Sequence, residues 1–248
     1  MTEVGTAQAQ DDRTRVVRSG PGASASHPLD NPVRAALTGP HARFAERRGR
    51  VLRYPGDVTP WFALPDAPDA DDWADAAALA GPGGSVLLLN FRGEPPATWT
   101  TGFHAEGVQL AGERVDAAPD PEAVRLGPAD VPEMLDLVAR TEPGPFLPRT
   151  VDMGSYLGIR RGGALVAMAG ERLHPAGWTE ISAVCTDPAA RGQGLAGRLI
   201  RAVAHGIEQR GETSFLHAVD SNTGAVRLYE ALGFRLRARV SFREAVAP

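Results

Sequence analysis

A glycine-rich turn between a short apolar run and an amphipathic segment restricts the fold of this chain more than any other stretch. Residues 186–200 read TDPAARGQGLAGRLI. The apolar residues 181–185 before them are typical of a strand, whereas the residues after the turn repeat with the period of a helix. One face of that helix carries the apolar residues Leu195, Leu199, Val203 and Ile207. Such a turn brings free backbone N–H groups and the positive end of a helix dipole together, so we expect a phosphorylated ligand there.

The turn agrees with two classes of phosphate ligand. Residues 192–197 spell G-x-G-x-x-G, and Asp220 follows at the end of the next expected strand, as in a dinucleotide-binding fold. In such a fold the first glycine follows the strand almost directly, however, whereas residues 186–191 intervene here. Few residues also remain after Asp220 for the further strands of a doubly wound sheet. A nicotinamide or flavin dinucleotide therefore stays an alternative ligand.

Read as Arg-x-x-Gly-x-Ala, with Arg191, Gly194 and Ala196 at the fixed positions, the same turn resembles the coenzyme A pyrophosphate loop of the GNAT N-acetyltransferase superfamily. A second motif of that superfamily, N-x-x-A-x-x-L-Y-x-x-x-G-F, is matched in register by Asn222, Ala225, Leu228, Tyr229, Gly233 and Phe234. The resemblance covers about residues 123–246, and around the glycine turn it is closest to the C-terminal domains of glycine N-acyltransferase-like proteins. It implies an α+β (α/β) GNAT fold, in which helices flank a mixed central sheet.

The composition of the chain divides it into four parts. Residues 1–28 are polar and without periodicity, which predicts a disordered tail. Residues 117–122 contain two prolines and predict a linker between domains. The GNAT domain then occupies residues 123–248, and residues 29–116 form a smaller N-terminal α/β domain without a recognisable motif. In the branch named above, such a domain is sometimes a degenerate copy of the same fold, so its role stays open.

Local signals place the elements of the first half. We expect a short helix within residues 31–46, a helix over 69–80, a strand over 85–90 and one or two strands within 100–110. Residues 60–65 read PWFALP, an aromatic cluster that either lines a pocket or, as we expect, caps a small core.

The second half follows the order of the GNAT fold. A strand over residues 124–126 precedes a helix for which Asp130 and Glu133 predict a capping box. A hairpin then turns at Gly162 and Gly163. The remaining elements are a strand over 178–186, a helix that stops at Gly211, a strand over 213–220, a helix capped by Asn222 and ended by Gly233, and a final strand or bent pair of strands over 234–246.

The composition also excludes several classes of function. No apolar run reaches the roughly 20 residues of a membrane-crossing helix, and the N-terminus has no signal-peptide core. The single cysteine, Cys185, excludes a disulfide framework and a multi-cysteine zinc site. All 26 basic residues are arginines, but they form no basic stripe of the kind that binds nucleic acid. We therefore expect a cytoplasmic enzyme without a metal ion, with neither a membrane nor a nucleic-acid partner.

The resemblance implies which residues contact acetyl-CoA as co-substrate. Backbone groups of Val184 and Thr186 should bond the pantetheine arm, and an N–H group near Val184 should meet the thioester oxygen. The pyrophosphate should be held by N–H groups of the glycine turn, with Arg191 nearby; these are Gly192, Gln193, Gly194, Leu195 and Ala196. Asn222 serves either as a plain helix cap or as cap and cofactor contact.

Candidate catalytic residues follow from the same resemblance. Tyr229 is the expected general acid, although a tyrosine at this spacing also suits the core face of a helix. Glu180, at the start of the strand before the turn, is the expected base, with a solvated edge-strand carboxylate as the alternative. Glu171 is the second candidate base, and His217 faces either the cleft or the core. Cys185 is expected to be a small buried residue and not a nucleophile.

The predicted function is direct transfer of an acetyl or other short acyl group from acyl-CoA to an amine. The acceptor is a small molecule or a protein N-terminus or lysine, and the sequence does not decide between them or fix the oligomeric state. A non-catalytic acyl-CoA-binding regulatory module is an alternative of a different class. It would keep the glycine turn, but would acetylate no amine.

Overall fold

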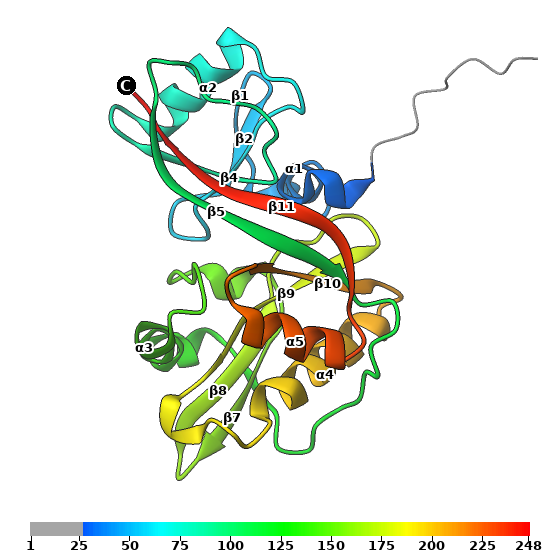
Figure 1. The fold of residues 1–248 in the computed structure, drawn as a ribbon. Coiled ribbons are helices and arrows are strands. Elements are labelled where there is room, and N and C mark those ends of the chain that lie inside the picture. The colour runs from blue at the N-terminus through cyan, green and yellow to red at the C-terminus, as the bar shows by residue number, and fades with distance from the viewer. Residues whose placement is uncertain (1–26) are drawn as a thin grey trace, which may run out of the picture.

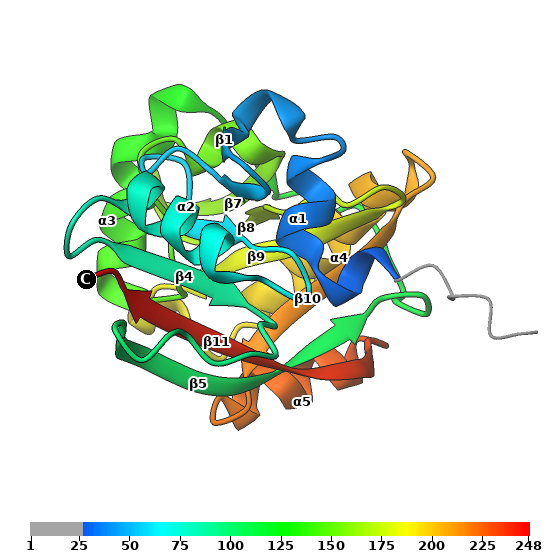
Figure 2. The same cartoon turned by 90° about the horizontal axis from the view of Figure 1, so that it is seen from above.

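The computed structural model describes residues 27–248, whose strands form one mixed 11-stranded sheet with helices on both faces (Figures 1 and 2). The strands lie in the order β1-β2-β3-β4-β11-β5-β10-β9-β8-β7-β6. Their bounds are β1 Glu46–Arg48, β2 Val51–Arg53, β3 Trp61–Ala63, β4 Ser85–Leu89, β5 Thr100–Ala111, β6 Val124–Leu126, β7 Tyr156–Arg161, β8 Ala164–Glu171, β9 Trp178–Thr186, β10 Thr213–Val219 and β11 Arg235–Val246. The helices are α1 Pro32–Leu37, α2 Ala70–Ala80, α3 Val131–Thr141, α4 Leu195–Glu208 and α5 Thr223–Ala231.

Most of the predicted elements are confirmed. The segment predicted to hold one or two strands is the single strand β5, and β11 is one strand bent by two register shifts. Gly162 and Gly163 have positive φ at the turn between β7 and β8, and Gly233 has φ +104° just after α5. The tail predicted for residues 1–28 lies outside the described residues, apart from its last two.

The capping box predicted from Asp130 and Glu133 does not form. A 3-10 turn over Pro128–Asp130 precedes α3, so the Asp130 carboxylate accepts a hydrogen bond from the Gly127 N–H, at 2.9 Å. Both carboxylates also bind the Arg160 guanidinium, at 2.7 and 2.6 Å. The carboxylates that were expected to cap the helix join α3 to β7 instead.

The sheet does not break at residues 117–122, where we predicted a boundary between two domains. β5 belongs to the first part of the chain, yet it pairs antiparallel with β10 on one side and β11 on the other. Figure 1 shows the long strands β5 and β11 crossing the middle of the molecule. The predicted linker is also docked, because Asp120 and Glu122 bind Arg198 of α4. The predicted boundary at residues 117–122 therefore does not coincide with a break in the sheet.

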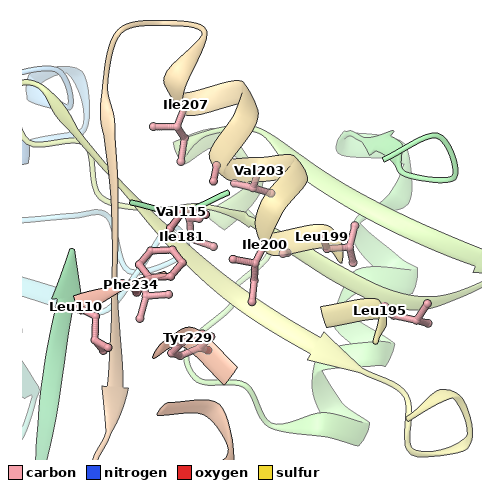
Figure 3. Close-up of a cluster of buried hydrophobic side chains, with 14 of the residues drawn as sticks. Leu110, Val115, Ile181, Leu195, Leu199, Ile200, Val203, Ile207, Tyr229 and Phe234 are labelled. Atoms are coloured by element: carbon pink, nitrogen blue, oxygen red, sulfur yellow. The ribbon is translucent and has the colours of Figure 1, made fainter. Parts of the chain in front are cut away.

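Apolar side chains cover both faces of the sheet. On one face, α4 and α5 bury a cluster that includes Leu110, Ile181, Leu199 and Phe234 (Figure 3). On the other face, the first part of the chain shares a core with the second. The residues of that shared core include Leu29, Tyr54, Trp61, Met153, Leu173, Phe215 and Val240. A third cluster lies beneath α3. The two parts of the chain are therefore joined by side-chain packing as well as by the sheet.

The site is positioned by two neighbouring parallel strands that diverge. β9 and β10 pair only from Thr213 to Phe215, where Phe215 lies opposite Glu180. Beyond that point β9 has a register shift against β8, and Ala183 takes the left-handed conformation, with φ +51°. A bulge of this kind re-aims the strand and frees its backbone groups from the ladder. The glycine turn and α4 follow directly after β9.

Candidate active site

A cavity of about 870 Å³ opens where β9 and β10 diverge. One of its walls is β9 from Ile181 to Thr186, and another is the end of β10. The glycine turn and the first residues of α4 line it at one end, and side chains from α5 line it nearby. Trp61, Leu87 and Phe242, on β3, β4 and β11, also face it. A volume of this order is typical of ligand pockets.

The glycine turn has the backbone conformation that an anion-binding loop requires. Gly192 and Gly194 have φ +78° and +71°, and Gly194 is the N-cap of α4. A Cβ added at either glycine would meet no protein atom within 4 Å, so the turn faces open space. The first N–H groups of α4 have no partner within the helix, because an α-helical N–H bonds to the carbonyl four residues earlier and the first residues have no such carbonyl inside the helix. The turn therefore presents unpaired donors at the positive end of a helix dipole.

The predicted cofactor residues lie around this cavity, with one exception. Those that line it are Val184, Thr186, Arg191, Gly192, Gly194, Leu195, Ala196 and Asn222. Gln193 does not line it, so only its backbone position between the two glycines supports its predicted role. The Thr186 hydroxyl is buried and has no hydrogen-bond partner among the described residues. The Arg191 side chain is exposed, and its Nε lies 3.4 Å from the Thr186 carbonyl.

Tyr229 and Asn222 come to the cavity from either end of α5. The Tyr229 ring packs in the core against Phe234, with 6.2 Å between ring centroids, while the residue also lines the cavity. Burial raises the pKa of Tyr229 to about 12, so the phenol keeps its proton at neutral pH. The Asn222 side chain accepts a hydrogen bond from the Ala225 N–H at 3.1 Å, which confirms its predicted role as helix cap. Both interpretations of Tyr229, core residue and cavity residue, are therefore compatible with its position.

The structure does not support Glu180 as the base that takes a proton directly. Its side chain is fully buried and does not line the cavity. Arg172 donates to both carboxylate oxygens at 2.8 Å, and the Leu173 N–H approaches one of them at 3.3 Å. Burial alone would raise the pKa of Glu180, but the charge of Arg172 and the hydrogen bonds from Arg172 and His217 hold it well below its usual range. A carboxylate with that pKa and those partners is a poor proton acceptor at neutral pH.

Hydrogen bonds fix the tautomer of His217. Gln109 donates through Nε2 to the Leu29 carbonyl at 2.9 Å and accepts at Oε1 from Arg237 at 2.7 Å, so its amide has one orientation. The same Nε2 lies 2.9 Å from Nε2 of His217, which must therefore accept. The proton is then on Nδ1, which donates to Glu180 at 2.7 Å. Both ring nitrogens of His217 are engaged, although the residue lines the cavity.

The other two candidates have structural roles. Glu171 is buried away from the cavity, and its carboxylate binds Arg210 at 3.0 Å and the Ser155 N–H at 3.2 Å. Cys185 packs beneath α3, and burial raises the pKa of its thiol, which agrees with the expected buried residue. Glu171 is therefore not placed to take a proton from a substrate in the cavity, whereas Cys185 lines the cavity but has a thiol that burial keeps from ionising.

Sequence reasoning missed the part of the cavity that the first half of the chain supplies. Trp61, Leu87 and Phe103 lie on β3, β4 and β5, and Arg172 follows the end of β8. The predicted aromatic cluster 60–65 included Trp61, which is both a core residue and a cavity residue. No motif marks Arg172. Burying an arginine costs free energy unless a buried acid pairs with it, so Glu180 on the neighbouring strand was the one feature that could have indicated Arg172.

Diverging parallel strands that lead into a glycine turn at a helix N-terminus form a site suited to a long phosphorylated ligand. Residues 156–243 match the family model of the FR47-like proteins. A solved structure from Novosphingobium aromaticivorans DSM 12444, described as an acetyltransferase of the GNAT family, is 38% identical. The similarity covers 90% of this chain and 100% of that one, with a TM-score of 0.82. The chain belongs to the GNAT family of acetyltransferases, whose members transfer an acyl group from acetyl-CoA to an amine.

Two further similarities are weaker, the first in sequence identity and the second in the length matched. A GCN5-related N-acetyltransferase from Kribbella flavida has the same fold, with a TM-score of 0.59, 18% identity and coverage of 89% of this chain and 96% of that one. A mycothiol acetyltransferase from Thermomonospora curvata is 40% identical over 76 residues, which are 30% of this chain. The match spans a quarter of that relative's length. None of the helices within residues 27–248 has the length and hydropathy needed to cross a bilayer.

Proposed function

We propose that this protein transfers an acetyl group from acetyl-CoA directly to the amine of an acceptor. The observation that supports this most is the separation of β9 from β10 beyond Phe215, beside a glycine turn that presents unpaired N–H groups. A thioester arm that enters between the strands can pair with the freed backbone of β9, while its pyrophosphate meets the start of α4. A nicotinamide dinucleotide would need the glycine turn directly after the strand, and here Pro188–Ala190 forms a 3-10 turn in between.

The residues of the site have distinct roles in this proposal. Backbone groups of Val184 and Thr186 hold the thioester arm, and an N–H group at the Ala183 bulge stabilises the negative charge that develops on the thioester oxygen. N–H groups from Gly192 to Ala196 hold the pyrophosphate, with help from Arg191. The set that we assign to the co-substrate is Val184, Thr186, Arg191, Gly192, Gln193, Gly194, Leu195, Ala196 and Asn222. Tyr229 donates its proton to the departing thiolate.

Proton removal from the amine is assigned differently from our sequence-based expectation. We infer that Glu180 positions Arg172 and His217 and does not itself take the proton. Glu142, at the end of α3, is the carboxylate that lines the cavity, and it forms no ion pair within the described residues. It is exposed, so it is placed to accept a proton through solvent.

Two finer assignments accompany the proposal. We assign the chain to the branch with glycine N-acyltransferase-like C-terminal domains, which the resemblance of the glycine turn supports, and to the cytoplasm, which agrees with the single buried cysteine. The mycothiol acetyltransferase matches too little of this chain to indicate the same acceptor.

Thermal melts with separate ligands test the proposal before the acceptor is known. A ligand at 100 times its dissociation constant stabilises the native state by about 2.7 kcal/mol, which raises the melting temperature by roughly 5–10 °C. We expect this rise with acetyl-CoA and with free coenzyme A, and none with NAD. The reverse pattern would favour the dinucleotide alternative. Acetyl-CoA binding without acetylation of any amine in a broad panel would favour the regulatory module.

A further inference from the structure

One side of the cavity combines an apolar wall with hydrogen-bond donors that have no partner. Trp61, Leu87 and Phe242, from β3, β4 and β11, form the wall, and Phe103 of β5 stands half exposed beside them. The Trp61 and Phe242 rings lie 6.3 Å apart, measured between centroids. These strands bring residues from both halves of the chain to the same place. The side chains are remote from the glycine turn in the sheet order, so we assign this surface to the acceptor and not to the co-substrate.

The indole N–H group of Trp61 is the first unpaired donor. Its nitrogen is buried, and it has no hydrogen-bond partner within residues 27–248. A buried donor without a partner costs about 1–3 kcal/mol, so native structures rarely leave one. When such a group belongs to a residue that lines a ligand cavity, the ligand itself can supply the acceptor.

Arg172 is the second donor, and its orientation is fixed. Its Nε and Nη2 bind the two oxygens of Glu180, and its guanidinium carbon lies 5.6 Å from the centre of the Trp61 ring. In the described part of the chain no hydrogen bond involves Nη1, while Arg172 lines the cavity. The ion pair therefore immobilises the guanidinium and leaves Nη1 able to donate to a ligand. A guanidinium held in this way loses little entropy when it binds a second carboxylate.

The charges around the cavity favour an anionic group. Its charged lining residues are Arg172, Arg191, Arg243 and Glu142, of which Arg243 is paired with Glu94 at 2.8 Å. Glu180 lies behind Arg172 and does not line the cavity. A second ammonium group on the acceptor would therefore meet a guanidinium beside the apolar wall, with no free carboxylate to pair with there.

We propose that the acyl acceptor is an amine that carries a carboxylate on an apolar body, such as an aromatic or branched amino acid. The carboxylate accepts hydrogen bonds from Nη1 of Arg172 and Nε1 of Trp61, and the apolar body packs on Leu87 and Phe242. The amine then faces β9, where the acyl group is delivered. This assignment rests on the proposed acetyltransferase function and names its acceptor.

Matched pairs of amines test the assignment. 4-(Aminomethyl)benzoate and 4-(aminomethyl)benzamide have the same body and the same reacting amine, and differ only in the carboxylate. Phenylalanine and phenylalaninamide form a second pair with a shorter spacing, compared over a range of pH because their amines differ in basicity. With acetyl-CoA as donor, we expect at least one acid to exceed its amide by about tenfold or more in kcat/KM, since hydrogen bonds to a charged group are the strong ones. Equal rates, or faster amides, would overturn the assignment while leaving the transferase function intact.

Trp61→Phe removes the N–H group and keeps an aromatic ring on the wall. We expect this variant to raise KM for the preferred acid by about three- to tenfold, and by a larger factor than it raises KM for the amide, since the hydrogen bond to the charged group is the stronger one. Trp73→Phe is the control, since Trp73 is a buried residue of α2 and does not line the cavity. An unchanged KM for the acid in Trp61→Phe would remove the indole from the assignment and contradict it.

A binding measurement separates this inference from the proposed function. With the protein saturated in free coenzyme A, the N-acetyl derivatives of each acid and amide are titrated by calorimetry. Tighter binding of an acetylated acid than of its amide supports the carboxylate site even when turnover is slow. Equal binding of both overturns it. Absence of acetyl-CoA binding and of any acetylated product would instead refute the transferase function.

Discussion

The carboxylate of Glu180 and the guanidinium of Arg172 form a two-pronged ion pair, with both nitrogen–oxygen distances at 2.8 Å, inside the protein beside the cavity. Their backbones are also bonded, because the Arg172 N–H donates to the Glu180 carbonyl at 2.9 Å. His217 and the Leu173 N–H complete the surroundings of the carboxylate. A buried charge is tolerated only when it is paired and hydrogen-bonded, and this one is. The pair therefore orients two cavity residues and contributes to folding.

Glu180→Gln should lower stability more clearly than it alters the chemistry. Removing one charge of a buried pair costs about 3–5 kcal/mol, which corresponds to roughly 6–20 °C in melting temperature. The pH–rate profile should keep its acidic limb, because the residue that titrates there is another group. A thermal melt and a pH–rate profile of the same variant distinguish a role of Glu180 in stability from a role as the base. Loss of the acidic limb at unchanged stability would restore Glu180 as the base.

The same carboxylate gives the folded protein an acid sensitivity with a definite sign. The pKa of Glu180 in the folded state is depressed below its ordinary value of 4.5. Its contribution to the free energy of unfolding is therefore complete above about pH 4.5 and decreases as the pH falls from there toward the folded-state pKa. Urea unfolding between pH 3 and pH 7 should show a smaller loss in Glu180→Gln than in the wild type. An equal loss in both proteins would assign the acid sensitivity to other groups.

Ala196→Asp should weaken coenzyme A binding without weakening the fold. Ala196 is the second residue of α4 and lines the cavity, so a carboxylate there opposes the pyrophosphate. The same charge stabilises a helix N-terminus by about 0.3–1 kcal/mol. We expect the dissociation constant of coenzyme A to rise by about tenfold or more at low salt, while the melting temperature of the free protein stays equal or rises. Ala196→Asn is the uncharged control of equal size, and equal loss of affinity in both variants would argue against a phosphate at this turn.

Tyr229→Phe should act on kcat and leave coenzyme A affinity nearly unchanged. The phenol stays protonated at neutral pH because burial raises its pKa to about 12, and its ring remains packed against Phe234 when the oxygen is removed. A general acid contributes typically 10²–10⁴-fold, and the variant tests whether this one does. Single-turnover rates with acetyl-CoA, together with a melt to show that the core is intact, provide the measurement. An unaltered kcat would make Tyr229 a core residue only.

The sequence was sufficient to predict which residues of the proposed cofactor side come together, because their motifs are local. The glycine turn, Asn222 and Tyr229 lie on elements whose periodicity and caps are written in neighbouring residues, and the structure places all of them at one cavity. Glu180 lies on the expected strand, but its burial and its ion pair with Arg172 do not support the predicted role as base. Whether a carboxylate is free or paired depends on partners such as His217, which lies on another strand and is not recognisable as a partner from spacing.

The acceptor side could not be predicted for a related reason. Trp61 and Arg172 are 111 positions apart, and they meet only because β3 and β4 join the same sheet as β10 and β9. The insertion of β5 between β10 and β11 is equally non-local. The proline-containing segment 117–122 therefore has the local pattern of a domain boundary, although ion pairs hold it against α4. Such pairings depend on long-range register, which local patterns do not encode.

Because β5 lies between β10 and β11, residues 29–116 should not unfold separately from the rest. Three of the four tryptophans, Trp61, Trp73 and Trp99, lie in the first part of the chain, so the measurement uses a Trp178→Phe background in which fluorescence reports on that part alone. Far-ultraviolet circular dichroism reports on the whole sheet. We expect the two thermal transitions to coincide, and acetyl-CoA to raise both by the same amount. Val86→Ala changes a buried residue of β4 far from the glycine turn, and it should lower the free energy of unfolding of this shared transition by roughly 1–3 kcal/mol. Two separate transitions, with only one shifted by acetyl-CoA, would show that the shared sheet does not make the two parts a single cooperative unit.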